Sequence, residues 1–186
     1  MTTVRAVTSN DIDRTDPPYI ADEVTTLRAF LDFYRATIRR QADGLTAEQL
    51  ATPLPPATMT LGGMLKHLAG VEQWWLPMVL DGREEEAPWI PDGVFDDDND
   101  WEWHSAKDDD YESLTRWYDD SVAESDRIID RAMTSQQGLD TLAVRPRRDG
   151  SIASLRWILV HLIEEYARHA GHADLIRESI DGATDL

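Results

Sequence analysis

The chain has 186 residues, 41% of them apolar, and this size and composition favour one globular domain with a sizeable core. Its 36 acidic and 18 basic residues give a net charge of −18, which argues against nucleic-acid binding because a phosphate backbone would be repelled. No run of residues approaches about 18 consecutive apolar positions and there is no cysteine, which excludes a membrane span, a disulfide and a protein thiolate nucleophile.

Residues 1–19 are predicted to form an N-terminal tail outside the packed domain. They contain several aspartates and the pair Pro17–Pro18, and they lack the apolar segment of a secretory signal. We therefore expect a cytoplasmic protein whose single domain spans residues 20–182.

The first half of this domain carries two segments with apolar residues at helical spacing. The first segment covers about residues 20–40, and the second begins near residue 60. Thr46 begins a capping-box pattern for a short helical turn, and Thr60 is the expected N-cap of the second long helix. Pro77 is expected to bend or end that helix, and Gly82 closes it.

The second half carries two further helical segments, at about residues 110–133 and 154–180. Ser154 marks the start of the last helix and Gly182 its end. Residues 139–144 predict at most a short extended piece. Four long amphipathic helices without a convincing strand pattern indicate an all-α fold, a helical bundle.

Residues 81–109 make a long connection between the second and third helices. Loops of this length are commonly functional or disordered, and Trp89, Trp101 and Trp103 favour packing over disorder. We expect a crossover or a lid over one end of the bundle. The acidic run at residues 96–100 lacks the glycine and the final glutamate of a calcium-binding EF-hand loop, so it predicts a solvated acidic loop.

The last predicted helix carries a stripe of residues that can bind a metal. At about 100° per residue, taking His161 as the origin, Glu165 lies at about 40°, His169 at about 80° and His172 at about 20°. Imidazole nitrogens and a carboxylate oxygen pointing in one direction form a partial coordination sphere for a divalent metal.

His67 on the second helix lies within an apolar arc and is expected to face the core. A lone inward histidine is more often structural, but a bundle brings the inward faces of two helices together. His67, Glu165 and His169 are then the predicted ligands, with His161 as an alternative ligand. Two imidazoles and one carboxylate fit a catalytic site with an open position for zinc, with Fe(II) or Ni(II) as alternatives.

The segments 157–161 and 165–172 together resemble the last-helix signature of the DinB-like superfamily, and residues 61–72 resemble its second-helix segment. The resemblance covers about residues 20–180. It implies an antiparallel four-helix bundle of the DinB/YfiT-like type with a three-residue metal site, in which His67 supplies one ligand.

Two positions depart from the commonest pattern of the superfamily. Glu165 stands where a histidine is usual, and His172 stands where a glutamine is usual. The resulting His/Glu/His set is similar to that of mycothiol-dependent maleylpyruvate isomerase, a relative within the superfamily. This likeness implies an enzyme that uses mycothiol or another small thiol, and the absence of protein cysteine is compatible with it.

On this resemblance, the metal held by His67, Glu165 and His169 lowers the pKa of the small thiol, which attacks an electrophilic substrate in a transfer or an isomerisation. His172 is expected either to support the metal ligands or to carry a proton at this site. The alternative is that His172 simply faces solvent. Two alternatives stay open: a metal-dependent hydrolase, and a metal-binding stress-related protein without turnover. A homodimer is expected by analogy only.

Other charged and aromatic residues near these segments receive structural interpretations. Glu164 is expected in solvent, and Glu72 is expected to be structural or paired with an arginine. Arg168 and Arg177 are predicted to be exposed, with binding of a substrate carboxylate as the alternative. The pair Trp74–Trp75 is predicted to lie in the core, with a substrate platform as the alternative.

Overall fold

The computed structural model describes residues 12–184 and is all-helical in that range, as predicted. The long helices are α1 (Glu23–Ala42), α3 (Leu61–Gln73), α6 (Tyr111–Met133) and α7 (Leu155–Asp181). The shorter elements are α2 (Ala47–Leu50), η1 (Trp74–Leu80), α4 (Val94–Asp97), α5 (Trp101–Ser105), η2 (Ala106–Asp108) and η3 (Gly138–Asp140). In the described range, the extended piece predicted at residues 139–144 amounts to one isolated bridge between Leu142 and Ser154.

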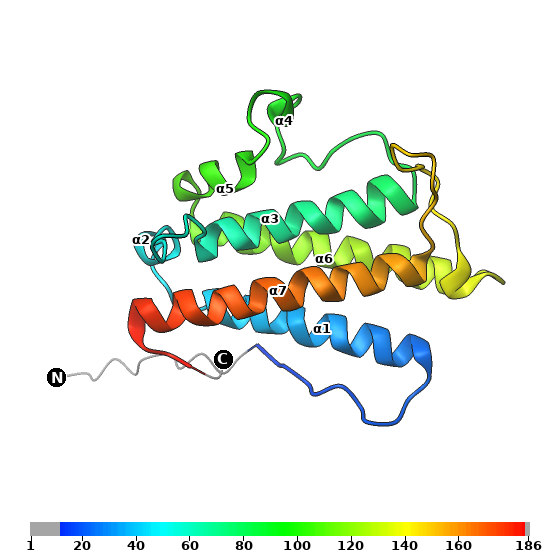
Figure 1. Cartoon of the computed structure of the whole chain (residues 1–186), viewed down its shortest axis with the longest axis horizontal. Helices are drawn as coiled ribbons and strands as arrows, with labels where there is room; N and C mark the ends of the chain where they lie inside the picture. Colours follow the sequence, from blue (N-terminus) through cyan, green and yellow to red (C-terminus); the bar gives the residue numbers. More distant parts are fainter. Residues whose placement is uncertain (1–11, 185–186) are drawn as a thin grey trace.

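The four long helices lie side by side, with α1 packed on α7 and α3 packed on α6 (Figure 1). Glu23 pairs with Arg156 and Gln41 bonds Asp174, so α1 and α7 run parallel. Figure 1 shows α3 and α6 running in the opposite direction to that pair. Antiparallel contacts therefore join the two pairs of helices, while the contacts within each pair are parallel. The connection of residues 81–110 crosses back along α3, as a crossover must.

Side-chain caps explain where the long helices begin. Each N-cap residue accepts a hydrogen bond from the backbone N–H three positions on; these residues are Asp22, Thr60, Asp110 and Ser154. The predicted start near residue 20 is therefore shifted to Glu23 by the Asp22 cap. The capping box at Thr46 is confirmed, because its side chain and that of Gln49 bond each other's backbone.

Pro77 changes the type of helix instead of ending it. From Trp74 the chain continues as the π-helical segment η1, in which Asp81 N–H donates to the carbonyl of Leu76. The prediction that Trp74 lies in the core is wrong, because this wider turn leaves its side chain 45% exposed. Trp75 is half-buried against the core.

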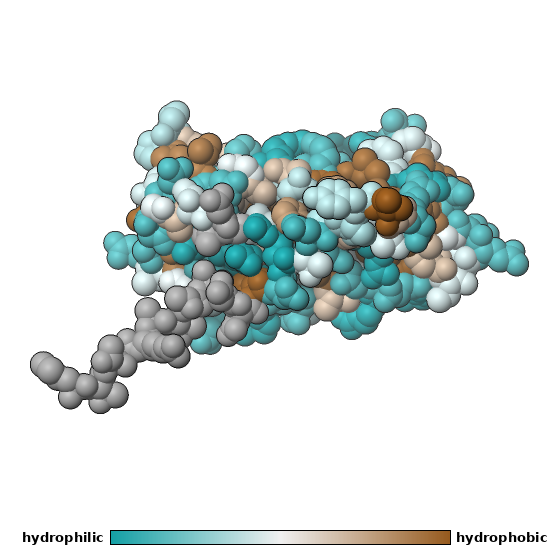
Figure 2. Space-filling model, turned by 90° about the horizontal axis from the view of Figure 1, so that it is seen from below, coloured by the Kyte–Doolittle hydropathy of each residue, from teal (hydrophilic) through white to brown (hydrophobic). Residues whose placement is uncertain are grey.

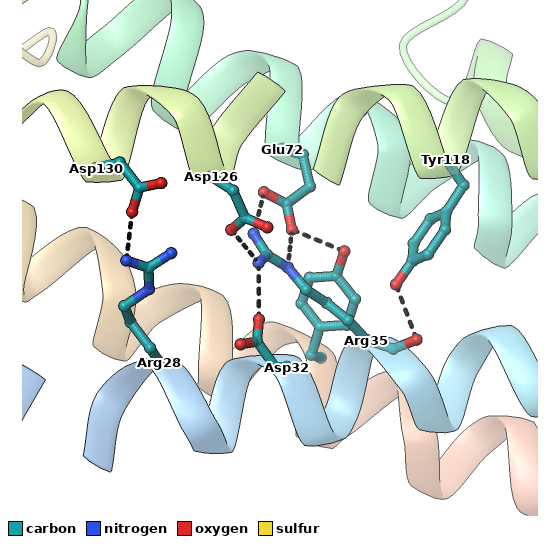
Figure 3. A network of polar contacts seen from close by, with 8 residues as sticks. Arg28, Asp32, Arg35, Glu72, Tyr118, Asp126 and Asp130 are labelled. Atoms are coloured by element: carbon teal, nitrogen blue, oxygen red, sulfur yellow. Dashed lines mark hydrogen bonds and ion pairs between the residues drawn. The ribbon is translucent and has the colours of Figure 1, made fainter. Parts of the chain in front are cut away.

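A buried ion pair ties three of the long helices together (Figure 3). Arg35 of α1 donates from Nε and Nη2 to the two carboxylate oxygens of Glu72 on α3, at 2.8 and 2.9 Å. Tyr166 of α7 donates its hydroxyl to the same carboxylate at 2.9 Å. Burial, together with the Glu72 charge, raises the pKa of Tyr166 well above its ordinary value, so the hydroxyl stays a donor. The expected pairing of Glu72 with an arginine is confirmed.

Arg177 is buried, so the prediction that it lies exposed on the last helix is wrong. Its Nη1 donates to the carbonyls of Gln41 and Asp43 at 2.8 and 2.9 Å, and its guanidinium pairs with Asp181. These carbonyls belong to the C-terminal end of α1, where backbone acceptors lack partners within the helix. The parallel packing of α1 and α7 brings Arg177 to that end.

The surface reflects the acidic composition. Figure 2 shows a face on which hydrophilic residues predominate and apolar residues lie in small separate patches. In the described range, no helix combines the length and the apolar character that crossing a membrane would require.

Replacing Glu72 with alanine should lower the free energy of unfolding by about 3 kcal/mol, because it leaves the buried Arg35 guanidinium without its main partner. Urea unfolding followed by circular dichroism measures this change. Asp130→Ala, which removes the exposed partner of Arg28, is the control and should cost less than about 1 kcal/mol. Equal losses in the two variants would show that the buried ion pair contributes no more to the free energy of unfolding than the exposed one.

Candidate metal centre

His67, Glu165 and His169 each bring one donor atom into a single group, as predicted. These atoms all lie within 4.8 Å of one another. Glu165 Oε1 lies 3.5 Å from His67 Nε2 and 3.3 Å from His169 Nε2. Atoms about 2.1 Å from one tetrahedral ion lie about 3.4 Å apart, so the two measured separations suit a common divalent ion.

Two antiparallel helices build this group. On α7, the spacing of four residues between Glu165 and His169 puts both side chains on one face. On α3, His67 faces them across the interface, and its ring centroid lies 5.1 Å from that of His169. His169 is buried, whereas His67 and Glu165 are half-buried, so the group borders solvent on one side.

Glu102 of α5, which no sequence pattern predicted, orients His67. Its Oε1 lies 2.9 Å from Nδ1 of His67, a separation that fits a hydrogen bond from a protonated Nδ1 and leaves Nε2 free to face Glu165. The neighbouring Trp103 stacks on the His67 ring at 4.8 Å. A Cβ at Gly63 would lie 2.8 Å from the Trp103 ring, so this glycine lets the indole approach α3.

Lys66 anchors the segment that carries Glu102. Its ammonium is buried and donates to Asp109 at 2.6 Å and to Ser105 at 2.8 Å. It also lies 4.1 Å from the centroid of the Trp101 ring, a cation–π contact. Residues 101–109 are therefore fixed on α3 immediately beside His67.

Arg168 holds the second oxygen of Glu165. Its Nη1 donates to Oε2 at 3.1 Å, while its Nη2 bonds Glu164. Arg168 and Glu164 are exposed, as predicted. The carboxylate of Glu165 is therefore divided, with Oε2 on the arginine and Oε1 directed at the two histidines.

His169 is suited to donate a lone pair at neutral pH. Burial, with the nearby His67 ring as the next cause, lowers the pKa of His169 to about 4. Its Nδ1 is buried and has no hydrogen-bond partner in the described range. A neutral imidazole in this position presents Nε2 to Glu165 and to any ion beside it.

The other two histidines of α7 lie outside this donor group. His172 is half-buried, with its ring 5.5 Å from that of His169. Its Nδ1 is buried and unpartnered within residues 12–184. His161 packs between Trp75, at 4.8 Å, and Trp157, at 5.1 Å.

A pocket of about 370 Å³ opens beside His67 and Glu102. Its walls come from α3, from η1 and from the connection that crosses α3, and they are largely apolar. Trp74, Trp75, Trp89 and Phe95 line it. A small molecule in this pocket would contact an apolar wall with its body and His67 with one end.

A sequence model of the family described as mycothiol S-transferase matches residues 26–182. The chain belongs to the mycothiol S-transferase family. No curated protein matches the sequence. The match confirms the resemblance to the DinB-like superfamily and its mycothiol-dependent members. The matched residues include the whole donor group and Glu102, which links the family to this part of the fold.

In this mycothiol S-transferase family member, the stability of the metal-free protein should depend on His169 between pH 6.5 and about 4. In the unfolded chain the His169 imidazole takes up a proton near its ordinary pKa of 6.5. In the folded protein it takes up the proton only near its lowered pKa of about 4. The free energy of unfolding therefore falls as the pH falls through this window, by about 1.4 kcal/mol per pH unit from this group.

Urea unfolding at several pH values, compared between the wild type and His169→Gln, isolates this contribution because the other groups titrate in both proteins. The variant should lack that part of the slope. Parallel pH profiles would contradict the lowered pKa, as would an NMR titration that places the His169 pKa near 6.5.

Proposed function

We propose that this protein is a metal-dependent thiol S-transferase. It uses mycothiol or a similar low-molecular-weight thiol and transfers its sulfur to a small electrophile. Family membership supports the thiol chemistry. The observation that carries the metal dependence is the convergence of His67, Glu165 and His169, with Glu102 behind His67. The chain has no cysteine, so the reacting thiol comes from the small molecule.

The donor set fits a divalent ion, with zinc as the first candidate and nickel or iron as alternatives. Two imidazoles and one carboxylate are typical of a catalytic site, which keeps a position open for a ligand from solvent. When bound, the ion supplies the positive charge that lowers the pKa of a thiol and makes it nucleophilic at neutral pH.

The surrounding residues prepare this site. Glu102 keeps the proton of His67 on Nδ1, and Arg168 holds one oxygen of Glu165, so the donor atoms point inward before any ligand arrives. Trp103 covers one side of the His67 ring and restricts water there. The aromatic pocket beside His67 receives the electrophile.

In the transfer step a carbon–sulfur bond forms, and the thiol loses its proton. His172, next to His169, is our candidate to carry that proton to solvent. If the electrophile has a leaving group, the conjugate is the product. If it has a conjugated double bond, addition followed by loss of the thiol gives an isomer.

We further propose that residues 20–182 form one DinB/YfiT-like four-helix-bundle domain, with residues 1–19 as a tail. The packing of α1, α3, α6 and α7 supports this domain. Residues 1–11 of the tail lie outside the described residues.

Replacing His67 with alanine should abolish metal binding, because Glu165 and His169 alone leave a two-residue site. Elemental analysis after dialysis against zinc measures the stoichiometry. His161→Ala is the matched control, an imidazole on α7 outside the group, and should retain about one ion per chain.

Glu102→Gln should weaken the zinc affinity about 10- to 100-fold without changing the stoichiometry, because it removes only the partner of His67.

Unchanged stoichiometry in His67→Ala would show that α7 binds the ion by itself. Loss of metal in His161→Ala would assign a ligand role to His161.

Titration of the cobalt-loaded protein with a low-molecular-weight thiol tests the transferase. A thiolate-to-cobalt charge-transfer band should appear at millimolar thiol, and mass spectrometry should detect the S-conjugate when an alkyl chloride is added. The His67→Ala variant should give neither signal. Absence of both in the wild type would refute the thiol-transfer role, and thiol-independent ester hydrolysis would favour the hydrolase.

A further inference from the structure

Arg145, Arg147 and Arg148 lie together beside a second pocket, of about 440 Å³, that the metal centre does not use. In the part of the chain that the structure describes, none of them has a carboxylate within 4.0 Å, whereas most other arginines there are paired. The chain has twice as many acidic as basic residues, so three adjacent unpaired guanidinium groups are unexpected. They form a local positive site on a molecule with a net charge of −18.

The backbone holds these arginines in a fixed loop. Ala143 N–H donates to Ala153, and Arg147 N–H donates to Ser151, each at 2.8 Å, which pairs the two arms of residues 141–155. Arg145 N–H donates to Val79 at 3.0 Å, which attaches the loop to the end of η1.

Gly82 permits this attachment. It has a positive φ of 77°, and a Cβ there would lie 2.5 Å from a methyl group of Val144. The close packing of residue 82 on residue 144 places the arginine loop against η1.

Indole rings lie under two of the guanidinium groups. Arg145 stacks over Trp74 at 5.5 Å, and Arg147 lies over Trp75 at 6.0 Å and over Trp157 at 5.4 Å. Stacking on an aromatic face leaves the in-plane N–H groups of a guanidinium available to a ligand. Arg145 uses one N–H group on the carbonyl of Arg83 at 3.2 Å.

Asp149 also lines this pocket, but its carboxylate is occupied by the turn. One oxygen accepts from Ser151 N–H at 2.9 Å and from Ser151 Oγ at 2.6 Å. The hydrogen bonds from the hydroxyl and the backbone N–H of Ser151, and after them the Arg147 charge, lower the pKa of Asp149. One negative charge facing three guanidinium groups leaves the pocket positive.

The pocket adjoins the metal centre through shared side chains. Trp74 and Trp75 line both this pocket and the one beside His67. Trp75 and Trp157 also pack on His161, which precedes Glu165 by one turn of α7. A ligand on the arginines therefore contacts the same two indoles that line the pocket beside His67.

We propose that Arg145, Arg147 and Arg148, with Trp74 and Trp75, bind the carboxylate of a small planar molecule. Guanidinium groups match carboxylates in bidentate geometry, and the indole faces accept a flat conjugated body. That this molecule is the electrophile of the thiol transfer rests on the proposed function; the anion site itself does not. The substrates selected are then unsaturated or aromatic carboxylates.

Benzoate, benzamide and inorganic phosphate are the probes, because benzamide has the shape of benzoate without its charge. Isothermal titration calorimetry of the full chain measures binding, and the tryptophan indole N–H signals in NMR locate it. Benzoate should bind at least tenfold more tightly than benzamide or phosphate. Arg145→Gln/Arg147→Gln should weaken benzoate at least tenfold. The control Arg116→Gln/Arg127→Gln removes the same charge from exposed positions on α6 and should change affinity less than twofold.

The measurement is repeated in His67→Ala to exclude carboxylate binding at the metal centre, and benzoate affinity should persist there. Equal affinity in the test and control double variants, or equal affinity for benzoate and benzamide, would overturn the site. Phosphate binding as tight as benzoate binding would overturn the planar carboxylate as its ligand. Loss of benzoate binding in His67→Ala would assign that binding to the metal centre and overturn the separate site.

The link to catalysis is tested with 4-(chloromethyl)benzoate and its amide as electrophiles. In each transfer the carbon–sulfur bond forms, chloride leaves with the bonding electron pair, and the thiol proton goes to solvent. The wild type should prefer the carboxylate in kcat/KM at least tenfold. Arg145→Gln/Arg147→Gln should lose this preference, whereas the control Arg116→Gln/Arg127→Gln should keep it. An unchanged preference would overturn the substrate role. If neither electrophile reacts although benzoate binding depends on the arginines, the proposed transferase fails and the anion site stands.

Discussion

The buried contact between Arg35, Glu72 and Tyr166 is the constraint on which the geometry of the site depends. Glu72 lies five residues after His67 on α3, and Tyr166 directly follows Glu165 on α7. The hydrogen bond from Tyr166 to Glu72 therefore fixes the register of the two helices that supply the donor atoms. A slip of one turn, about 5.4 Å, would separate His67 from Glu165.

A polar contact serves this purpose better than apolar packing alone. Leucine and methionine side chains fill the same interface in more than one arrangement, whereas a carboxylate with three donors accepts one arrangement. The buried pair adds little net stability, because both charges lose their hydration, but any other register leaves a buried charge unpaired. We infer that this contact mainly selects one register of the helices and adds little to the stability of their packing.

The sequence predicts those parts of the molecule that depend on local periodicity. Helix starts such as Thr60 follow from capping chemistry, and the donor group follows from the stripe on one helix and an inward His67 on another. Glu102 escaped prediction because it reaches the site from an aperiodic connection, where only the tryptophans signal packing. Arg177 was misjudged because its partners are carbonyl groups at the end of another helix. Their position depends on the direction of packing, which a single-helix pattern does not contain.

The π-helical segment η1 contributes side chains to both pockets. In η1 both indoles line the pocket beside His67 and also the pocket beneath the arginines. Pro77, which has no N–H to donate, fits in this widened turn, and the loop of residues 141–155 then bonds to its end. The π-helical segment and the loop attached to its end thus place Trp74 and Trp75 between the arginines and the pocket beside His67. In the proposed substrate the arginines recognise the carboxylate, which leaves the electrophilic end free for the thiol.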